Sequence, residues 1–115
     1  KFINSISHIT GGGIIENLPR VIPEEFIAII DSQDFNIPER FLWLKDLGNI
    51  TNLEMLKTFN CGIGLVLVVK KQNLKKVSSF FKKQSINFYI MGKIIKKKIK
   101  NKKIIIKKFG KWHLK

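Results

Sequence analysis

The 115-residue sequence predicts an α+β fold, a mixed β-sheet flanked by helices. Apolar stretches of strand type occur near both ends and in the middle of the chain, and segments with helical spacing lie between them. The expected order of elements is β-α-β-α-α-β-α-β-β, without an internal repeat. A chain of this length is expected to form one domain around one core.

The chain opens with an expected strand over residues 2–10, in which apolar and polar side chains partly alternate. The glycines at positions 11–13 end this strand at Thr10. Residues 14–18 predict a short helix, which stops near Pro19 because the residue before a proline avoids the α region.

A compact apolar run over residues 26–31 predicts a buried strand. Residues 32–38 are expected to form a loop, whose last residue, Pro38, suits the first turn of a helix. That helix covers residues 38–48, with Gly48 at its C-terminal stop. Its apolar face is expected to combine Phe41, Leu42, Leu44 and Leu47.

The next helix is expected to begin at Thr51, whose hydroxyl can cap it, and Glu54 completes a capping box three positions later. The apolar residues that follow helical spacing are Leu53, Leu56 and Phe59. The apolar run over residues 63–69 then predicts a central strand that is covered on both faces.

Residues 73–84 place apolar side chains at helical intervals opposite lysines, which predicts an amphipathic surface helix. Residues 88–95 and 102–108 predict two strands that form a hairpin at the sheet edge, where lysines oppose aggregation. We expect a domain of residues 1–95, followed by a lysine-rich strand or tail of residues 96–115.

The formal net charge of +14 is concentrated in the second half of the chain. All eight acidic residues lie at or before Glu54, and residues 55–115 carry eighteen lysines and no acid. Only two of the 22 basic residues are arginine, whose planar fork suits phosphates and base edges. This pattern favours a solvated lysine-rich surface over a dedicated nucleic-acid site, although such a surface attracts polyanions at low salt.

The sequence also argues against several classes of protein. Its longest apolar run, residues 63–69, is far shorter than the roughly 20 residues of a membrane span, and we expect no signal peptide. The single cysteine, Cys61, cannot form an internal disulfide and favours a reducing, cytoplasmic location. No metal site is expected, because His8, His113 and Cys61 share no ligand spacing.

The glycine run at positions 11–13 is the first candidate for chemistry. Three successive glycines allow backbone N–H groups to converge on an anion, and the start of the following helix adds a favourable dipole. The alternative is a plain tight turn, because the spacing matches neither the P-loop nor the dinucleotide-binding pattern. Spacing alone leaves both interpretations open.

The segment TFNCGIG, residues 58–64, is the second candidate. The Asn60 amide is both a donor and an acceptor for a polar ligand. The alternative is structural, because Gly62 and Gly64 permit close packing where a helix meets a strand. His8 is either a strand histidine that is hydrogen-bonded within the loop or a base that faces a pocket.

Five segments resemble one enzyme family in the same order: SHITGGGIIENLPRVIP (7–23), AIID (28–31), FLWLKDLGNI (41–50), EMLKTFNCGIGLVLVV (54–69) and YIMG (89–92). They resemble the C-terminal half of the aminoimidazole ribonucleotide synthetases, also called phosphoribosylformylglycinamidine cyclo-ligases. The resemblance covers about residues 3–95. It departs modestly at Leu56, where an aromatic residue is common, and at Leu65, where methionine is usual.

This resemblance implies a ligase of purine biosynthesis that uses ATP, with Mg²⁺, to close the imidazole ring of formylglycinamidine ribonucleotide. The formyl oxygen is phosphorylated, and the substrate's own nitrogen then attacks the same carbon and expels phosphate. By the same resemblance, ATP is bound mainly by a preceding N-terminal half, which also builds a homodimer. We therefore expect this chain alone to be inactive.

The resemblance further implies a site in the cleft between the two halves, near the ribose phosphate or the transferred phosphoryl group. The expected substrate- and phosphate-binding residues are Gly11, Gly12, Gly13, Asn17, Arg20 and Asn60. The expected loop-shaping residues are His8, Thr10, Gly62 and Gly64. The resemblance assigns no catalytic residue.

Two alternatives stay open at this stage. The first is the C-terminal half of a related ATP-using enzyme, such as selenophosphate synthetase or the hydrogenase-maturation dehydratase, which share the architecture. The second belongs to a different class, a basic nucleic-acid-binding module that uses the lysine face. The lysines lack the interleaved aromatic residues that stack on bases, which disfavours this second alternative.

Overall fold

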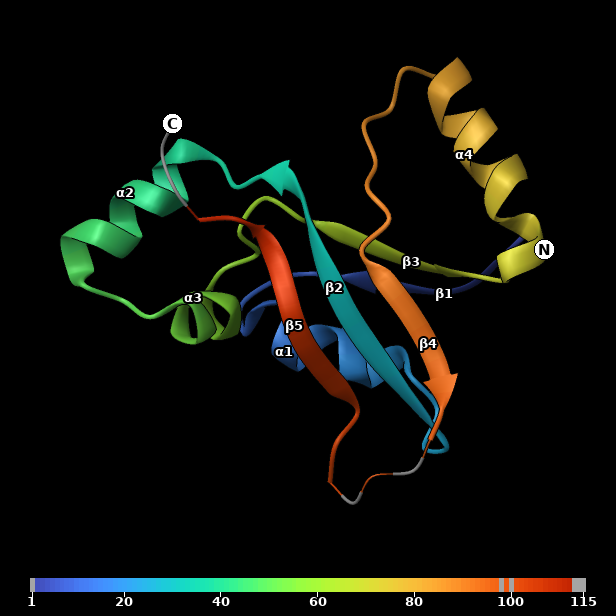
Figure 1. Ribbon diagram of the computed structural model, residues 1–115, viewed down its shortest axis with the longest axis horizontal. Coiled ribbons are helices and arrows are strands. Elements are labelled where there is room, and N and C mark those ends of the chain that lie inside the picture. The colour runs from blue at the N-terminus through green and yellow to red at the C-terminus, as the bar shows by residue number, and fades with distance from the viewer. Residues whose placement is uncertain (1, 98, 100, 113–115) are drawn as a thin grey trace.

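The computed structural model describes residues 2–97, 99 and 101–112 and arranges the strands in two sheets (Figure 1). The strands are β1 (Ile3–His8), β2 (Phe26–Asn36), β3 (Leu65–Val69), β4 (Gly92–Lys96) and β5 (Ile104–Lys111). The α-helices are α1 (Gly13–Asn17), α2 (Glu39–Gly48), α3 (Asn52–Thr58) and α4 (Leu74–Lys83). Short 3₁₀ helices, η1 (Leu18–Val21) and η2 (Lys71–Asn73), follow α1 and precede α4. The predicted α+β class and order of strands and α-helices are confirmed.

Strand β2 is the centre of the three-stranded sheet, with β4 antiparallel on one side and β5 parallel on the other. The predicted hairpin between the last two strands is therefore wrong, although both do lie at sheet edges (Figure 1). The apolar run at the start of β2 explains this order, because a central strand buries apolar side chains better than a lysine-rich one.

Strand β2 extends to Asn36, so the loop predicted for residues 32–38 is wrong over most of its length. The extension is held by Phe35, which is buried and packs edge-to-face on Phe109 with 5.0 Å between ring centroids. The exposed polar residues Gln33 and Asp34 interrupt the apolar pattern and conceal this part of the strand in the sequence.

Strands β1 and β3 form a separate antiparallel pair, so the prediction of a central strand at residues 63–69 is wrong. Ile6 lies opposite Leu67, and His8 lies opposite Leu65. Ile6 and Leu65 are 54% and 56% exposed, which shows that one face of this pair is open. A continuous apolar run does not distinguish a strand covered on both faces from one covered on a single face.

The predicted cap of α3 is confirmed, because the Thr51 hydroxyl oxygen accepts a hydrogen bond from the Glu54 N–H at 3.2 Å. Helix α2 ends at Gly48 as predicted, and the left-handed cap residue is the following Asn49, with φ of 50°. Of the apolar face expected on α2, only Leu42 is fully buried.

One hydrophobic core joins the two sheets and the first helices. Its buried residues include Ile9, Ile14, Leu18, Ala28, Ile30, Met55, Leu56, Cys61, Ile63 and Phe109.

Helix α4 stands away from this core beside β3 and buries none of its side chains completely (Figure 1). This exposure confirms the predicted surface helix. None of the helices in the described ranges has the length and apolarity to cross a membrane.

A large part of the predicted lysine-rich tail is paired with the sheet through β5. Phe109 is 3% exposed, and Trp112 packs beside it with 6.2 Å between ring centroids. Residues 98, 100 and 113–115 of the predicted tail lie outside the described residues. The domain boundary at residue 95 stays a prediction.

We predict that Phe109→Ala lowers the free energy of unfolding by about 3–5 kcal/mol, because it removes a buried ring from the core. Phe80→Ala is the matched control, since the Phe80 side chain is 56% exposed and its loss should change the value by at most about 0.5 kcal/mol. Urea denaturation measures both. Equal, small effects would show that β5 lies outside the folding unit of residues 1–95.

Candidate functional site

The glycine loop of residues 10–13 connects β1 to α1 and lies against α3. Gly12 and Gly13 have φ values of 96° and 63°, in the left-handed region that favours glycine. A Cβ atom on Gly13 would overlap the backbone carbonyl of Leu56 in α3. Gly13 is therefore required for the close approach of α1 to α3, which is a structural reason for the third glycine.

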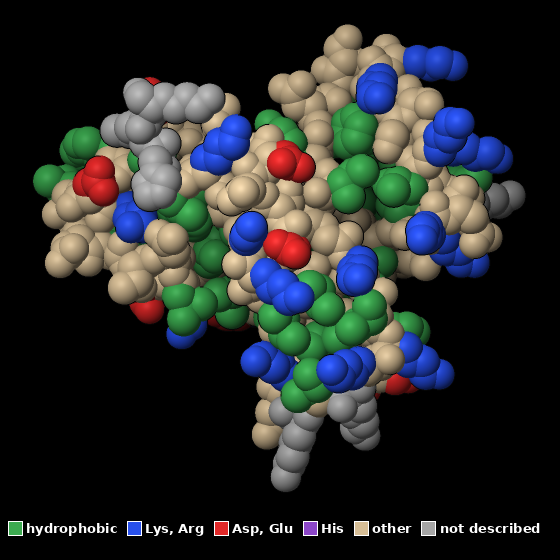
Figure 2. Space-filling view, viewed as in Figure 1, with side chains coloured by type: hydrophobic (Ala, Val, Ile, Leu, Met, Phe, Trp, Pro, Cys, Tyr) green, Lys and Arg blue, Asp and Glu red, His purple; other side chains and the backbone are tan. Residues whose placement is uncertain are grey.

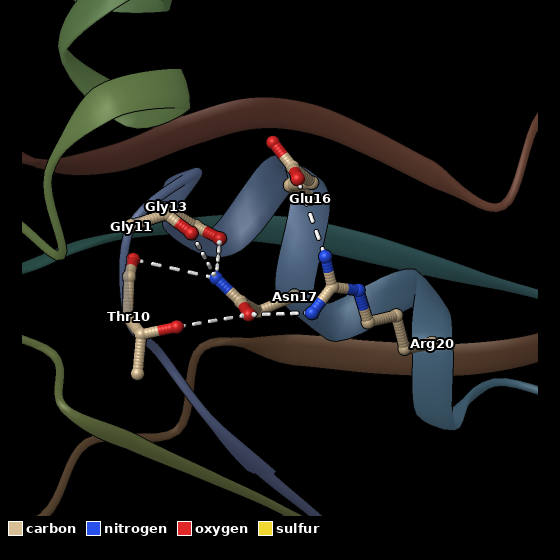
Figure 3. A network of polar contacts seen from close by, with 6 residues as sticks. All are labelled: Thr10, Gly11, Gly13, Glu16, Asn17 and Arg20. Atoms are coloured by element: carbon tan, nitrogen blue, oxygen red, sulfur yellow. Dashed lines mark hydrogen bonds and ion pairs between the residues drawn. The ribbon is translucent and has the colours of Figure 1, made fainter.

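The Asn17 side chain holds the glycine loop through hydrogen bonds to its backbone carbonyls (Figure 3). Its side-chain N–H₂ group donates to the carbonyl oxygens of Thr10, Gly11 and Gly13 at 3.3, 3.3 and 2.8 Å. Its side-chain oxygen accepts from the Thr10 hydroxyl at 3.3 Å. Asn17 is 5% exposed, so this network replaces hydrogen bonds to water that the loop carbonyls would otherwise make.

Arg20 is an exposed side chain that contacts the buried Asn17. Its guanidinium donates to the Asn17 side-chain oxygen at 3.5 Å and to a Glu16 carboxylate oxygen at 3.2 Å (Figure 3). The side chains of Arg20 and Glu16 are 65% and 61% exposed. An ion pair with this exposure contributes at most about 1 kcal/mol. The guanidinium can therefore leave Glu16 for a stronger anionic partner at small cost.

The three loop amides differ in their hydrogen bonds. The Gly13 N–H donates to the carbonyl oxygen of Thr10 at 3.0 Å. Within residues 2–97, 99 and 101–112, the N–H groups of Gly11 and Gly12 have no such acceptor. The loop thus keeps two backbone donors for a ligand. The expected helix dipole adds little, because α1 has five residues and few aligned peptide units.

A shallow pocket of about 280 Å³ brings the two sequence candidates together. Its lining combines the end of β1, the glycine loop, α2 and the segment after α3: Ile9, Thr10, Gly11, Phe41, Thr58, Phe59 and Asn60. Phe41 and Phe59 pack with their ring centroids 5.9 Å apart and form the apolar part of the wall. Polar groups from two segments nearly fifty positions apart in the sequence therefore share one hollow.

The turn after α3 orients the Asn60 side chain. Its oxygen accepts a hydrogen bond from the Gly62 N–H at 2.8 Å, which leaves the side-chain N–H₂ group as the donor for a ligand. Gly62 has φ of 97°, and a Cβ atom there would overlap the Pro38 ring at the start of α2. Gly62 is thus explained by close packing.

Cys61 directly follows Asn60 in this turn, and its thiol is unreactive at neutral pH. Its side chain is fully buried, and its thiol donates to the carbonyl oxygen of Met55 at 3.7 Å. Burial raises the pKa of the Cys61 thiol from 9.0 to about 12. Because the thiolate is the reactive form, Cys61 is not a nucleophile under physiological conditions.

The remaining predicted residues lie around the pocket without lining it. His8 is exposed at the end of β1. Gly64 accepts a hydrogen bond from the Ile9 N–H through its carbonyl at 2.9 Å, and a Cβ atom there would face open space. Close packing therefore explains Gly62 but not Gly64. Gly12, Gly13, Asn17 and Arg20 are absent from the lining: Gly12 and Gly13 follow the lining residue Gly11, Asn17 is hydrogen-bonded to Thr10 and Gly11, and Arg20 contacts Asn17.

Sequence reasoning missed four residues of the pocket wall, Ile9, Phe41, Thr58 and Phe59. Thr58 and Phe59 directly precede Asn60, so their position beside a candidate residue was the available signal. In the part of the chain that the structure describes, no group of three His, Cys, Asp or Glu residues is placed to hold a metal ion. His113 lies outside the described residues.

Comparisons with known proteins agree on one family. Residues 2–104 match the family model described as "AIR synthase related protein, C-terminal domain". The phosphoribosylformylglycinamidine cyclo-ligase of Neisseria gonorrhoeae is 44% identical over 90 residues, which are 78% of this chain and 26% of that protein. The cyclo-ligase of Ligilactobacillus salivarius is 41% identical over 106 residues, 92% of this chain and 31% of that protein.

A relative with further functions is also similar. The trifunctional purine biosynthetic protein adenosine-3 of Gallus gallus is 43% identical over 93 residues, 81% of this chain and 9% of that protein. The chain spans about a quarter to a third of the length of the cyclo-ligases it matches, between 26% and 31%.

The contact at Gly13 yields a test of the loop's structural role. Gly13→Ala should lower the free energy of unfolding by about 2–4 kcal/mol, because it strains the backbone and clashes with Leu56. Gly64→Ala is the control, expected to change it by at most about 0.5 kcal/mol because its Cβ meets nothing within 4 Å. Chemical denaturation compares the two variants. A Gly13→Ala protein as stable as Gly64→Ala would contradict the contact.

Asn17 yields a second test. Asn17→Ala should lower the free energy of unfolding by about 2–3 kcal/mol, because three loop carbonyls lose a shared buried donor. Asn17→Asp should be at least as costly, since a carboxylate cannot donate to those carbonyls. The exposed Asn4 provides the control through Asn4→Ala, with an expected change within about 0.5 kcal/mol. Thermal and urea unfolding curves that fail to separate Asn17→Ala from Asn4→Ala would refute this role.

Proposed function

The chain belongs to the family of AIR synthase related proteins, C-terminal domain, and from this membership we propose that it forms the C-terminal part of a phosphoribosylformylglycinamidine cyclo-ligase. The cyclo-ligases that it resembles are three to four times longer than the matched segment. Turnover would therefore require further polypeptide, either on the same chain or on a separate one. The printed names of these relatives favour this enzyme over selenophosphate synthetase and the hydrogenase-maturation dehydratase.

The shared pocket is the structural observation that supports this proposal. In the proposed enzyme, it receives the ribose phosphate end of formylglycinamidine ribonucleotide or the phosphoryl group transferred to it. The Gly11 and Gly12 N–H groups donate to phosphate oxygens, and Arg20 adds a charge-assisted contact after leaving Glu16. The Asn60 N–H₂ group orients the substrate from the other side.

The remaining proposed site residues act through the shape of the loop. Asn17 holds the loop carbonyls and thereby fixes the backbone that carries the Gly11 and Gly12 N–H groups. Gly13 allows the loop to lie against α3 and thus beside Asn60. Thr10 lines the pocket while its hydroxyl donates to Asn17. His8, Gly62 and Gly64 shape the flanking backbone.

This arrangement suits ring closure by positioned donors. The proposed reaction transfers a phosphoryl group to the formyl oxygen, and a substrate nitrogen then displaces phosphate at the same carbon. Such chemistry depends on orienting the substrate and stabilising negative charge, without a covalent nucleophile from the protein. The protonated Cys61 thiol is consistent with that requirement.

The proposal places ATP, which supplies the phosphoryl group, mainly on polypeptide beyond this chain. Among the described residues, no group of three His, Cys, Asp or Glu side chains is placed to hold a metal ion, and the proposal places the Mg²⁺ that accompanies ATP mainly beyond this chain as well. A homodimeric full enzyme and a cytoplasmic location belong to the same proposal, because they rest on the family resemblance and on the lone cysteine.

A chimaera tests the function directly. This chain replaces the matched 90-residue segment of the Neisseria gonorrhoeae cyclo-ligase, and conversion of formylglycinamidine ribonucleotide is assayed with ATP and Mg²⁺. The chimaera should close the imidazole ring, whereas this chain alone should not. A folded chimaera without activity would refute the proposed function.

The loop's role is tested in the same chimaera with Gly11→Asp. A Cβ atom on Gly11 meets nothing within 4 Å, so this variant should fold, but its carboxylate would repel a phosphate. We predict that kcat/KM falls by about 100-fold. Gly11→Asn, which has the same shape without the charge, should lose less.

Gly64→Asp supplies the matched control, because Gly64 also has open space around its Cβ position and does not line the pocket. Its kcat/KM should stay within about threefold of the parent chimaera. If Gly11→Asp is as active as Gly64→Asp, the glycine loop does not bind the phosphate.

A further inference from the structure

The three-stranded sheet has two apolar faces. On the inner face, Ala28 and Ile30 of β2 pack into the core together with apolar residues of β4 and β5. The alternate residues Ile27 and Ile29 point to the opposite, outer face. Their cross-strand neighbours are Ile95 on β4 and Ile105 on β5, so four isoleucines share this outer face.

The outer face is open over part of its area, because Ile27 is completely buried there whereas the other three isoleucines are not. A hollow of about 360 Å³ lies on it, lined by Ile29, Asp31, Gly92, Lys93, Ile95 and Lys107. The three isoleucines Ile29, Ile95 and Ile105 are only half-buried. Figure 2, seen from the same side as Figure 1, shows hydrophobic side chains gathered over the lower part of this sheet among lysines.

The order of the sheet argues that this face is normally covered. β2 lies between an antiparallel neighbour, β4, and a parallel neighbour, β5, and strands of parallel sheets are commonly covered on both faces. The start of β2 is apolar on both faces, which is typical of a strand between two layers. A single layer of helices on a sheet face is the common way to bury such residues.

We propose that this outer face is the docking surface of an amphipathic helix with acidic flanks, supplied by the part of the cyclo-ligase polypeptide beyond the matched segment. The inference rests on the proposed function for the existence of that polypeptide, since the matched relatives extend well beyond the segment they share with this chain. The apolar stripe of the helix covers the isoleucines, and its acids face the lysines at the border.

The charge around the hollow favours an acidic helix over a second copy of this chain as the occupant of this face. Of the lysines on β4 and β5, Lys93 and Lys107 line the hollow on this face. Asp31 is the single acid among the residues that line the hollow. A second copy of this chain would place lysine-rich strands against each other, which like-charge repulsion opposes. An acidic helix meets opposite charge at the same border.

Thiol labelling in the chimaera described above tests this surface. Lys107→Cys places a thiol at the border of the hollow, and Lys75→Cys places one on the exposed side of α4 as the control. The native Cys61 contributes little background, because it is buried and its pKa is raised to about 12. Maleimide labelling rates are compared between the isolated chain and the chimaera.

We expect Cys at position 107 to label at least about tenfold more slowly in the chimaera than in the isolated chain, whereas position 75 labels at similar rates in both. Adding Lys93→Glu should reduce the protection at position 107, because it repels the acidic flanks. Unprotected labelling at position 107 would overturn the docking surface, and unchanged protection with Lys93→Glu would overturn its acidic partner.

Ring closure, measured on the same samples, separates this inference from the proposed function. An active chimaera with rapid labelling at position 107 contradicts the docking surface alone. An inactive chimaera with protection at position 107 contradicts the proposed function and supports the docking surface.

Discussion

The contact between Gly13 and the carbonyl of Leu56 is the constraint on which the candidate site depends. It allows the first turn of α1 to lie directly against α3, and no larger residue permits that distance. Since Asn60 follows α3 closely, the same contact brings the glycine loop and the Asn60 turn into one pocket. A backbone contact in the core therefore determines the geometry of a surface site.

The residues around this pocket divide into those that hold the backbone and those that remain available to a ligand. Asn17 uses its donors on loop carbonyls, and Gly62 is required beside Pro38. The Gly11 and Gly12 amides and the Asn60 N–H₂ group stay available within the described structure, and Arg20 is held only by an exposed ion pair. In the proposed enzyme, rigid supports would keep these donors oriented before the substrate arrives, which lowers the cost of binding a phosphate.

Local signals in the sequence predicted much of the fold, and non-local pairing caused the errors. The Thr51 cap and the order of strands and α-helices follow from nearby residues, and both are confirmed. The pairing of β2 with both β4 and β5 depends on contacts across the whole chain, which neither spacing nor lysine content reveals. For the site, the glycines and Asn60 carried signals of their own, whereas Phe41 joins the pocket only through the packing of α2.

The central claim is that the glycine loop and Asn60 form part of a phosphate pocket, and ¹⁵N amide resonances test it most directly. The chimaera is titrated with formylglycinamidine ribonucleotide while the signals of Gly11, Gly12 and the Asn60 side chain are followed. The account predicts saturable shifts at all three, because their N–H groups gain an anionic or polar acceptor, with little change at Gly110, which does not line the pocket. Saturable binding that leaves the Gly11 and Gly12 signals unchanged would contradict it.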